Sequence, residues 1–381
     1  MKFLLIANYL PHVMNFRGKL LEAISNLGYE IHIFSPDLDS YPNEYKHLNS
    51  LGYHLHSIPL QRTGTNPVID TKTLIYTYRL LLKIKPDVIL SYTIKPVIYG
   101  TFAAWLAKVP HRYILISGLG YTFQNANTDI SYKPNRLQRL VYTLYKTAVS
   151  KSSKVFFQNF DDLQLFKDLK LMNQTVPAIV VNGSGVDTDY FNLTPLPKDS
   201  NNNVLPSFLL VARLLKDKGV LEYIEAAKIV KSKYPDAKFN LVGWIDENPA
   251  AISKKSLDQW IDEGIIKYWG KLDDVRPAVS ACSAFVLPSY REGTSRAVLE
   301  AMSMGRPIIT TDAPGCHDTV EESKNGFIVP VKSINELADR MIEMIENPRL
   351  FTTMGRESRK LAMDKYDVNK VNSFMINEMG L

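Results

Sequence analysis

Short apolar runs alternate with amphipathic helical patterns along nearly the whole chain, and no other feature constrains the fold as strongly. In the first half, apolar runs of strand length are residues 3–7, 30–34, 54–58, 87–91, 112–116, 154–158 and 178–181. Helical patterns occupy residues 15–27, 71–83, 97–107, 136–149 and 161–169. Alternation at these lengths predicts a parallel sheet that is covered by helices on both faces. We expect the tyrosine-rich pattern at 71–83 to pack into the core.

The second half repeats the alternation after a segment rich in turn residues. Residues 194–206 contain three prolines and three consecutive asparagines, which is typical of a linker. Beyond it, strands are expected at 208–212, 239–242, 266–269, 284–287, 307–310 and 326–329. Helices are expected at 220–233, 250–263, 275–281, 294–304, 335–346, 349–364 and 368–379.

The pattern therefore predicts an α/β protein of two doubly wound, Rossmann-like domains. We place the first domain at residues 1–190, a linker at 191–206 and the second domain at 207–365. A C-terminal helix within 366–381 is expected to pack back on the first domain. Doubly wound sheets bind ligands at the carboxyl ends of their strands, so the two domains are expected to face a ligand-binding cleft.

The stretch from residue 289 to residue 305 follows an expected buried strand and carries two carboxylates. Glu292 precedes Gly293, and Glu300 lies eight residues beyond Glu292. A helix rises ~1.5 Å per residue, which would put the carboxylates roughly 12 Å apart, about the span of a nucleotide-sugar. The N–H groups of Gly293, Thr294 and Ser295 at the helix start favour a phosphate. Alternatively, Glu292 complements the helix dipole and Glu300 is solvated.

Two cations, Arg213 and Lys218, follow the first strand of the second half. At the carboxyl edge of a sheet, facing a helix N-terminus, two cations can hold a diphosphate without a metal. The alternative is an ordinary basic loop. The presence of both carboxylates in the same half favours the diphosphate site.

Two Asp-x-Asp strings need separate consideration, because closely spaced carboxylates can bind a divalent metal. Asp37 and Asp39 follow a strand in a polar loop, and Asp187 and Asp189 lie in a turn-rich segment. Aspartates in such positions commonly form turns. We therefore expect no metal and no cofactor.

Several short motifs occur together in the second half. They are Ala212-Arg213 with Lys218-Gly219, Pro288-Ser289 with Glu292-Gly293, Glu300-Ala301, and Gly305 with Pro307, preceded by Asn182-Gly183, Val186-Asp187 and Tyr190-Phe191. In this combination the chain resembles the family-4 retaining glycosyltransferases of GT-B fold, over most of its second half.

The resemblance implies a role for each residue of the donor half. Arg213 and Lys218 would bind the donor diphosphate and stabilise the departing UDP. Glu292 would contact sugar hydroxyls on the reacting face, and Glu300 would bind the ribose. The mechanism would be retaining, with front-face attack and proton transfer to the leaving phosphate, so catalysis would rest on preorganised charge. The remaining donor-binding residues would be Gly243, Trp269, Lys271, Gly293, Thr294 and Ser295.

Two segments of the first half are informative about the acceptor. Residues 92–100 and the glycine-rich turn at 117–123 resemble the bacterial enzymes that extend undecaprenyl-diphosphate-linked sugars in O-antigen, capsule or N-glycan assembly. A Gly-Gly loop after the first strand and a histidine near residue 90, present in many family members, are absent. Structural loop roles stay open for His12, Arg17 and Lys95. The acceptor-binding candidates are His12, Arg17, Lys95, Gly118, Gly120, Tyr121, Arg136 and Arg139.

Positive charge is concentrated in the first half of the chain. Residues 1–190 carry a net charge of +7, and the remaining residues carry −1. Residues 132–154 contain six cations and no acid, interleaved with leucine, valine and tyrosine. Such a helix suits an anionic membrane surface or a lipid diphosphate, although a surface helix packed on the sheet is the alternative. The motifs of nucleic-acid-binding proteins are absent, so we expect no nucleic-acid partner.

The expected location follows from the apolar runs and the cysteines. Cys282 and Cys316 show no metal-ligand spacing and favour a reducing compartment. The apolar N-terminus ends at Asn8, too early for a signal peptide, and no run approaches the ~20 residues of a membrane helix. We expect a cytoplasmic protein, peripheral on the inner face of the plasma membrane.

The sequence therefore predicts a retaining hexosyltransferase of bacterial surface polysaccharide biosynthesis. It would move a hexose or N-acetylhexosamine, in the first place N-acetylgalactosamine, from a UDP-sugar to a polyprenyl-diphosphate-linked sugar. One alternative is a GT-B enzyme on a soluble substrate, either a small-glycoside transferase or a UDP-sugar epimerase. Another is a non-catalytic nucleotide-sugar-binding protein.

Overall fold

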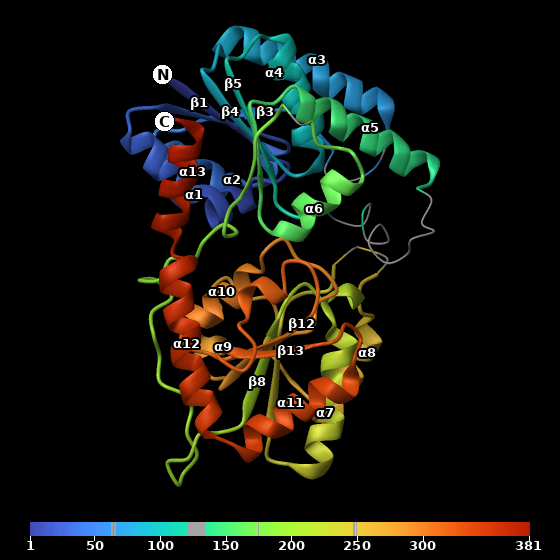
Figure 1. The fold of residues 1–381 in the computed structure, drawn as a ribbon, viewed down its shortest axis with the longest axis vertical. Helices are drawn as coiled ribbons and strands as arrows, with labels where there is room; N and C mark the ends of the chain where they lie inside the picture. The colour runs from blue at the N-terminus through green and yellow to red at the C-terminus, as the bar shows by residue number, and fades with distance from the viewer. Residues whose placement is uncertain are drawn as a thin grey trace. The chain divides into compact units, whose positions relative to one another are not determined.

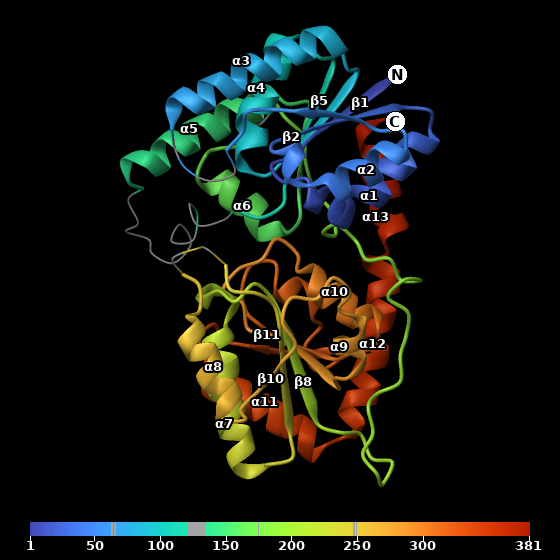
Figure 2. The same ribbon diagram turned by 180° about the vertical axis from the view of Figure 1, so that it is seen from behind.

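The computed structural model describes residues 1–381 except 62–63, 65, 120–122, 124–133, 174, 247 and 249. The chain forms two compact units (Figure 1). One comprises Met1–Ser184 together with Val371–Leu381, and the other comprises Gly185–Lys370. Each unit is built around one parallel sheet with helices on both faces, which is also seen from behind in Figure 2.

The sheet of the first unit has the strand order β3-β2-β1-β4-β5-β6-β7, with every pair parallel. Its central strand β1 is buried on both faces, with Phe3, Leu4 and Leu5 fully enclosed. This is the expected burial for a parallel strand between two helical layers. The strands are β1 (Lys2–Ile6), β2 (Glu30–Ser35), β3 (His54–Ser57), β4 (Val88–Tyr92), β5 (His111–Ile116), β6 (Lys154–Phe157) and β7 (Ala178–Val180).

The side chains of β1 alternate between two cores, as strand geometry requires. Phe3 and Leu5 pack with α1, α2 and the end of α13, whereas Leu4 and Ile6 pack with α3 and α4. A third cluster joins β5 and β6 to η2, α5 and α6. The helices are α1 (Pro11–Asn26), α2 (Pro42–Ser50), α3 (Pro67–Ile84), η2 (Pro96–Gly100), α4 (Thr101–Leu106), α5 (Arg136–Ser150), α6 (Phe160–Asp168) and α13 (Val368–Met379), with a short 3₁₀ turn η1 (Leu38–Ser40).

The end of α13 belongs to the core of the first unit. Met375 and Met379 are buried with the residues of β1 and α1. Lys154 Nζ lies 2.7 Å from Glu378 Oε2, and the Tyr113 hydroxyl donates to the carbonyl of Met379. None of the helices in the described parts of the chain has the length and apolarity needed to cross a membrane.

Helices of the first unit differ from the sequence expectation in several places, and the helix expected at 97–107 is divided into η2 and α4. Helix α1 begins at Pro11 rather than at residue 15, because proline is favourable in the first helical turn. Helix α2 was not predicted, since its nine residues bury only Leu48 and leave no apolar stripe to detect. The prediction that the tyrosine-rich residues of α3 lie in the core is wrong for Tyr76, which is 43% exposed.

The sheet of the second unit has the strand order β10-β9-β8-β11-β12-β13, again with every pair parallel. The strands are β8 (Ser207–Val211), β9 (Lys238–Val242), β10 (Lys267–Tyr268), β11 (Ala284–Leu287), β12 (Ile308–Thr311) and β13 (Gly326–Val329). The helices are η4 (Lys216–Lys218), α7 (Val220–Lys233), α8 (Lys254–Asp262), α9 (Arg276–Ser280), α10 (Arg296–Ser303), η5 (His317–Thr319), α11 (Ile334–Glu346) and α12 (Arg349–Lys365).

Two cores hold this sheet. Helices α7, α8 and α11 bury their apolar stripes against one face, and α9 and α10 cover the other face. Arg306, at the turn between α10 and β12, is fully enclosed and donates to the carbonyls of Thr194 and Pro195. These bonds fix part of the segment 191–206 along the second unit.

Candidate functional site

The carboxyl end of β8 carries the first predicted cation. Arg213 Nη1 lies 2.9 Å from Asp246 Oδ2, and the Arg213 side chain is 39% exposed. Asp246 follows β9, the neighbouring strand, so both groups come from the same edge of the sheet. The guanidinium is therefore oriented by a carboxylate while a large part of it stays accessible to a ligand.

The second predicted cation pairs with a predicted carboxylate. Lys218 Nζ, on η4, lies 2.6 Å from Glu292 Oε1, and the two side chains are only 17% and 15% exposed. The loop that carries Glu292 is also tied to η4 through its backbone, since Tyr290 N donates to the Asp217 carbonyl at 2.9 Å. The structure thus brings together Lys218 and Glu292, which lie 74 residues apart in the sequence.

Two glycines make this close packing possible. Gly219, directly after η4, has φ of +70°, and a Cβ there would lie 2.1 Å from the Pro288 carbonyl oxygen. Gly315 has φ of +72°, and its Cβ would lie 2.3 Å from the carbonyl oxygen of Glu292. Because any side chain at these positions would collide with backbone, both glycines are required for the loop that presents Glu292.

Two polar side chains, Tyr290 and Cys316, hold the same loop in place. The Tyr290 hydroxyl donates to Glu222 Oε1 at 2.6 Å, and burial raises the pKa of Tyr290. Cys316 is buried beside Ser289, and burial together with the nearby Glu292 carboxylate raises the pKa of its thiol to about 12. The thiol stays protonated at neutral pH, so Cys316 acts here as a packing residue.

Helix α10 starts later than the sequence suggested. Its first residue is Arg296 and its N-cap is Ser295, whereas a helix from residue 294 was expected. The separation of roughly 12 Å between Glu292 and Glu300 assumed helical rise throughout. This assumption is wrong for residues 292–295, so the helix does not set that distance.

Glu300 has a protein partner that the sequence analysis did not include. Arg296 Nε donates to Glu300 Oε1 at 2.7 Å, one helical turn apart. Burial raises the pKa of the Glu300 carboxyl, and the Arg296 guanidinium opposes that rise. The i,i+4 spacing of an arginine and a glutamate could have revealed this pair from the sequence.

The ends of β9 and β10 hold the residues expected near a base. Gly243 has φ of +153°, and a Cβ there would lie 1.9 Å from the Ala212 carbonyl oxygen. Trp269 Nε1 donates to Asn240 Oδ1 at 2.9 Å, which commits the polar edge of its indole to the protein. Lys271 Nζ lies 5.4 Å from the centroid of Trp244, whose side chain is 40% exposed. Trp244 is therefore the more accessible indole beside Gly243.

The predicted acceptor residues of the first unit are dispersed. His12 lies on α1 and contacts the rings of Tyr9 and Phe16, with centroid distances of 4.6 and 5.2 Å. Arg17, also on α1, is buried, and its guanidinium carbon lies 5.4 Å from the centroid of Tyr92 at the end of β4. Burial raises the pKa of Tyr92 to about 12, so its hydroxyl is protonated beside the guanidinium.

Lys95 is held within the helical layer. Its Nζ lies 2.7 Å from Asp70 Oδ1, and the Tyr99 hydroxyl donates to Asp70 Oδ2 at 3.0 Å. Both partners of the ion pair are at most 13% exposed, so Lys95 joins α3 to η2. A structural role, the alternative left open for Lys95, is the role these contacts support.

The other acceptor candidates lie around α5. Gly118 follows β5 with φ of +124°, and Gly120 and Tyr121 lie outside the described residues. Arg136 and Arg139 occupy the exposed start of α5. The set of acceptor residues therefore remains a prediction.

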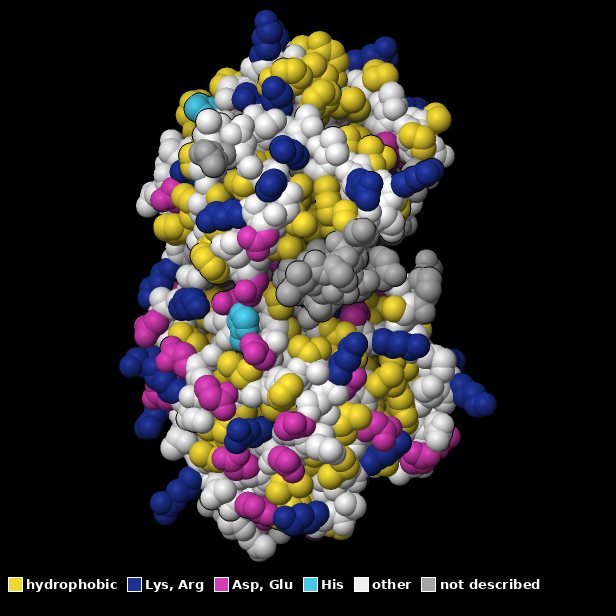
Figure 3. All heavy atoms as spheres, turned by 45° about the vertical axis from the view of Figure 1, so that its right-hand side comes forward, with side chains coloured by type: hydrophobic (Ala, Val, Ile, Leu, Met, Phe, Trp, Pro, Cys, Tyr) yellow, Lys and Arg dark blue, Asp and Glu magenta, His cyan; other side chains and the backbone are white. Residues whose placement is uncertain are grey.

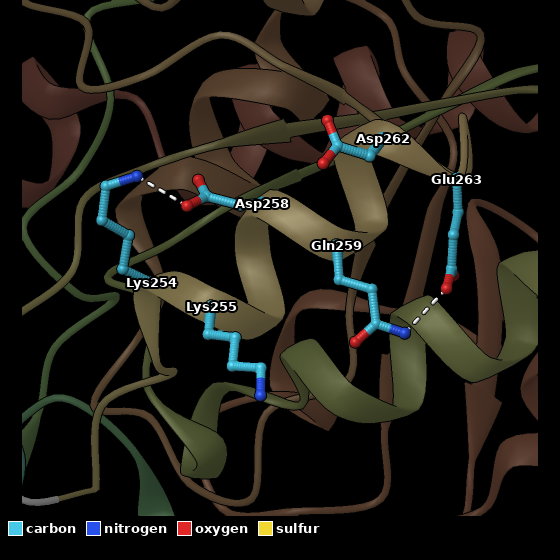
Figure 4. A pocket seen from close by; sticks show the side chains of 6 residues that line it. All are labelled: Lys254, Lys255, Asp258, Gln259, Asp262 and Glu263. Carbon is cyan, nitrogen blue, oxygen red and sulfur yellow. Dashed lines mark hydrogen bonds and ion pairs between the residues drawn. The ribbon is translucent and has the colours of Figure 1, made fainter.

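One further hollow lies on the exposed face of α8 (Figure 4). The residues that line it pair with one another. Lys254 Nζ lies 2.6 Å from Asp258 Oδ2, and Gln259 Nε2 donates to Glu263 Oε1 at 2.7 Å. Contacts of this i,i+4 type are those of an ordinary solvent-exposed helix. The hollow contains none of the predicted site residues.

The Asp-x-Asp string at Asp187 forms a turn, as expected from the sequence. Asp187 Oδ1 accepts from the backbone N–H groups of Asp189 and Tyr190, at 3.2 and 2.9 Å. Asp37 precedes η1 with φ of +51°. Both strings thus occupy turn geometry.

Comparison with known sequences gives matches to both halves of the chain. Residues 205–347 match the family described as "Glycosyl transferases group 1", and residues 2–159 match "Glycosyl transferase 4-like". A Campylobacter jejuni protein named N,N'-diacetylbacillosaminyl-diphospho-undecaprenol alpha-1,3-N-acetylgalactosaminyltransferase is 28% identical, over 94% of this chain and 92% of its own length. An Escherichia coli alpha-1,3-galactosyltransferase, named for UDP-Gal and alpha-D-GlcNAc-diphosphoundecaprenol, is 25% identical over 82% and 80%.

Solved structures share the fold. A sucrose-phosphate synthase of Thermosynechococcus elongatus has a TM-score of 0.78 at 16% identity, covering 99% of this chain and 98% of its own. Anabaena HepE, solved in complex with UDP-glucose, has a TM-score of 0.73 at 18% identity, covering 100% and 99%. The architecture is that of the GT-B enzymes, two Rossmann-like units each with a parallel sheet. The chain therefore belongs to the glycosyltransferases, with a group 1 second half and a family-4-like first half on the GT-B fold.

Proposed function

We propose that this glycosyltransferase moves a hexose or N-acetylhexosamine, in the first place N-acetylgalactosamine, from a UDP-sugar to a polyprenyl-diphosphate-linked sugar, with retention of configuration. The observation that carries the proposal is the ion pair of Lys218 and Glu292, together with the partly exposed Arg213 after β8. The Campylobacter jejuni relative, whose name specifies such a transfer, supports the choice of acceptor and sugar. The reaction would take place at the inner face of the plasma membrane.

Arg213 and Lys218 would bind the diphosphate of the donor. An ammonium group has three N–H donors, so Lys218 can keep its bond to Glu292 and still donate to a phosphate oxygen. Arg213 supplies a planar fork of donors that Asp246 orients. Both cations would stabilise the negative charge that grows on UDP as the bond between C1 of the sugar and the phosphate oxygen breaks.

Glu292 and Glu300 would fix the two ends of the donor. Glu292, held by Lys218 through Oε1, would accept a hydroxyl of the sugar on the reacting face. Glu300, oriented by Arg296, would accept the ribose hydroxyls. The amides of Gly293 and Thr294 and the edges of Trp244 and Lys271 would complete the donor site.

In the proposed reaction the acceptor hydroxyl attacks C1 from the face that UDP leaves. The new C1–O bond forms as the old one breaks, and the hydroxyl proton passes to the leaving phosphate oxygen. All electrons of the broken bond remain on UDP, so the reaction needs no redox partner.

Replacement of Lys218 by alanine tests the proposal directly. We expect Lys218→Ala to lower kcat/KM by roughly 10²–10³-fold, because one preorganised charge is lost at the leaving group. Turnover is measured with UDP-N-acetylgalactosamine and a synthetic polyprenyl-diphosphate-linked sugar. Lys216→Ala is the matched control, since Lys216 lies on the same 3₁₀ turn and is exposed.

Two results would overturn the proposal. Full turnover in Lys218→Ala would remove the assigned role of the ion pair. Conversion of UDP-sugar without any acceptor would identify a UDP-sugar epimerase, and transfer only to small soluble acceptors would identify a small-glycoside transferase.

A further inference from the structure

The exposed face of α3 is unusual for a helix that covers a sheet. One stripe along the helix is open to solvent, and it consists of Val68, Thr71, Lys72, Ile75, Tyr76, Arg79, Leu82 and Lys83. Its large apolar members are well exposed, from 43% for Tyr76 to 74% for Val68. A shallow hollow of about 310 Å³ lies along this stripe, between Val68 and Arg79. Half of the residues in this stripe are therefore apolar, and three of the others are cations.

Helices α4 and α5 also combine exposed apolar side chains with cations. Leu137 and Leu140 at the start of α5 are 47% and 55% exposed, beside the exposed Arg136 and Arg139. At the end of α4, Trp105 is 38% exposed, and Lys151 Nζ lies 4.5 Å from the centroid of its ring.

These helices form one layer. Helices α3 and α5 both pack against η2, and α4 packs against both of them. Figure 3 shows hydrophobic and basic side chains interspersed over this part of the first unit, with few acidic ones. We call the exposed residues of α3, α4 and α5 the outer face of the first unit.

The outer face has no acid of its own. Asp70 is the only aspartate or glutamate in the three helices, and it is buried in its ion pair with Lys95. Helix α11 of the second unit provides the contrast, because its exposed positions are Asn335, Glu336, Asp339 and Glu346. The charge of the outer face thus favours an anionic partner, and its exposed apolar side chains favour a partner with an apolar phase.

We propose that the outer face docks on an anionic lipid bilayer. Apolar side chains spread singly along three helices, each with a cation beside it, suit insertion among acyl chains and headgroups. Lysine and arginine can place their stems along the lipid and their charges at the phosphates, and tyrosine and tryptophan favour the same interface. Each such cation strengthens binding to an anionic surface.

The inference deepens the proposed function, since a lipid-linked acceptor would require the enzyme to work at a membrane, and it names the helices that meet it. It also extends the expected membrane contact of residues 132–154 to α3. The two proposals can fail separately, because vesicle binding is measured without donor or acceptor.

Charge reversal on α3 tests the electrostatic part. The full-length Lys72→Glu/Arg79→Glu variant is compared with wild type in flotation with phosphatidylcholine vesicles containing 30% phosphatidylglycerol. Each cation contributes roughly fivefold to affinity, so we expect binding to weaken at least roughly 25-fold. The control is Arg356→Glu/Lys360→Glu, which makes the same change in net charge on the exposed face of α12. The control should float like wild type.

A second variant tests the apolar part. Ile75→Ser/Leu82→Ser keeps every charge and should weaken vesicle binding by roughly tenfold or more, since two exposed apolar side chains are lost. If circular dichroism shows that the charge variant does not fold, this second variant still tests the proposal.

Equal flotation of wild type and both outer-face variants would overturn the proposal. The same loss in the α12 control would overturn it as well, because net charge alone would then explain binding. Wild type that binds neutral and anionic vesicles equally, or neither, would contradict the predicted charge selectivity.

Discussion

The cations at the predicted donor site and those on the outer face of the first unit differ in their surroundings. Arg213 and Lys218 each lie within 3 Å of a carboxylate, at 2.9 and 2.6 Å. Lys72 and Arg79 lie among exposed apolar side chains on helices without an exposed acid. An ion pair holds a cation in one geometry, which suits a small anion of defined shape, whereas exposed cations on flexible stems suit an extended surface.

Arg306 extends this comparison to a cation with no access to solvent. All its donors point to protein acceptors, including the carbonyls of Val279, Met304 and Thr194 at 3.0, 2.7 and 2.9 Å. Its role should therefore be stability alone. We expect Arg306→Leu to lower the free energy of unfolding by about 3–5 kcal/mol, because several enclosed carbonyl groups lose a charged hydrogen-bond donor. Urea denaturation followed by tryptophan fluorescence measures the change.

The control for this prediction is Arg276→Leu. Arg276 pairs with Asp274, but both side chains are more than one third exposed, so the loss should stay below about 1 kcal/mol. Equal destabilisation by the two variants would show that enclosure does not decide the role of these arginines.

Glu300 lies between the two extremes, since it is buried and pairs with Arg296 on its own helix. We expect Glu300→Gln to raise the donor KM by roughly tenfold or more with little change in kcat, because a charged hydrogen bond to the ribose is lost. Arg296→Gln should have a smaller effect. Initial rates over a range of UDP-sugar concentrations separate KM from kcat.

The pH profile checks that prediction independently. Because burial raises the pKa of Glu300, protonation begins at a higher pH than for an exposed glutamate. The donor KM of the wild type should therefore rise as pH falls through that raised pKa, and Glu300→Gln should abolish this rise. A pH dependence that survives unchanged in Glu300→Gln would refute the assigned role.

The smallest expected effect concerns the histidines of β2 and β3. His32 Nδ1 lies 3.0 Å from His56 Nε2, and the ring of His54 stacks on His32. Burial, with help from His32, His54 and Lys83, lowers the pKa of His56 to about 4, and burial lowers that of His32 although Glu30 opposes it. The unfolded chain therefore binds more protons than the folded one between about pH 4 and the ordinary histidine pKa of about 6.5.

Stability should consequently be complete above about pH 7.5 and decline as pH falls from about 6.5 towards 4. Since His56 is only half-buried, its share should be on the order of 1 kcal/mol. Thermal unfolding at pH 5 and pH 7.5 measures the decline, which His56→Gln should reduce. The exposed His47→Gln on α2 is the control and should leave the pH dependence unchanged.

Sequence reasoning was most successful where periodicity dominates. Both parallel sheets were predicted because their strands are apolar runs separated by helical patterns, and Arg213 and Lys218 were found because they follow β8 directly. It failed for α2, which buries one leucine, and for the start of α10, where the chain makes no turn of helix before Arg296.

The remaining failures concern partners that tertiary structure supplies. Nothing in the sequence around Lys218 indicates that its ammonium would meet Glu292, since packing of η4 against the loop after β11 brings them together. The pairing of Arg213 with Asp246 likewise depends on the order of β8 and β9 in the sheet. Exposure of Ile75 and Tyr76 on α3 depends on which stripe of the helix meets the core. From the composition of residues 71–83 alone, both side chains were expected to be buried in the core.

The most direct measurement of the central claim is the stereochemistry of transfer. Wild-type enzyme is incubated with α-linked UDP-hexoses and UDP-N-acetylhexosamines, including UDP-N-acetylgalactosamine, and a synthetic polyprenyl-diphosphate-linked sugar. NMR then determines the configuration of the new glycosidic bond. We predict acceptor-dependent formation of an α-linkage. A β-linkage, or consumption of donor without transfer to the lipid-linked sugar, would contradict it.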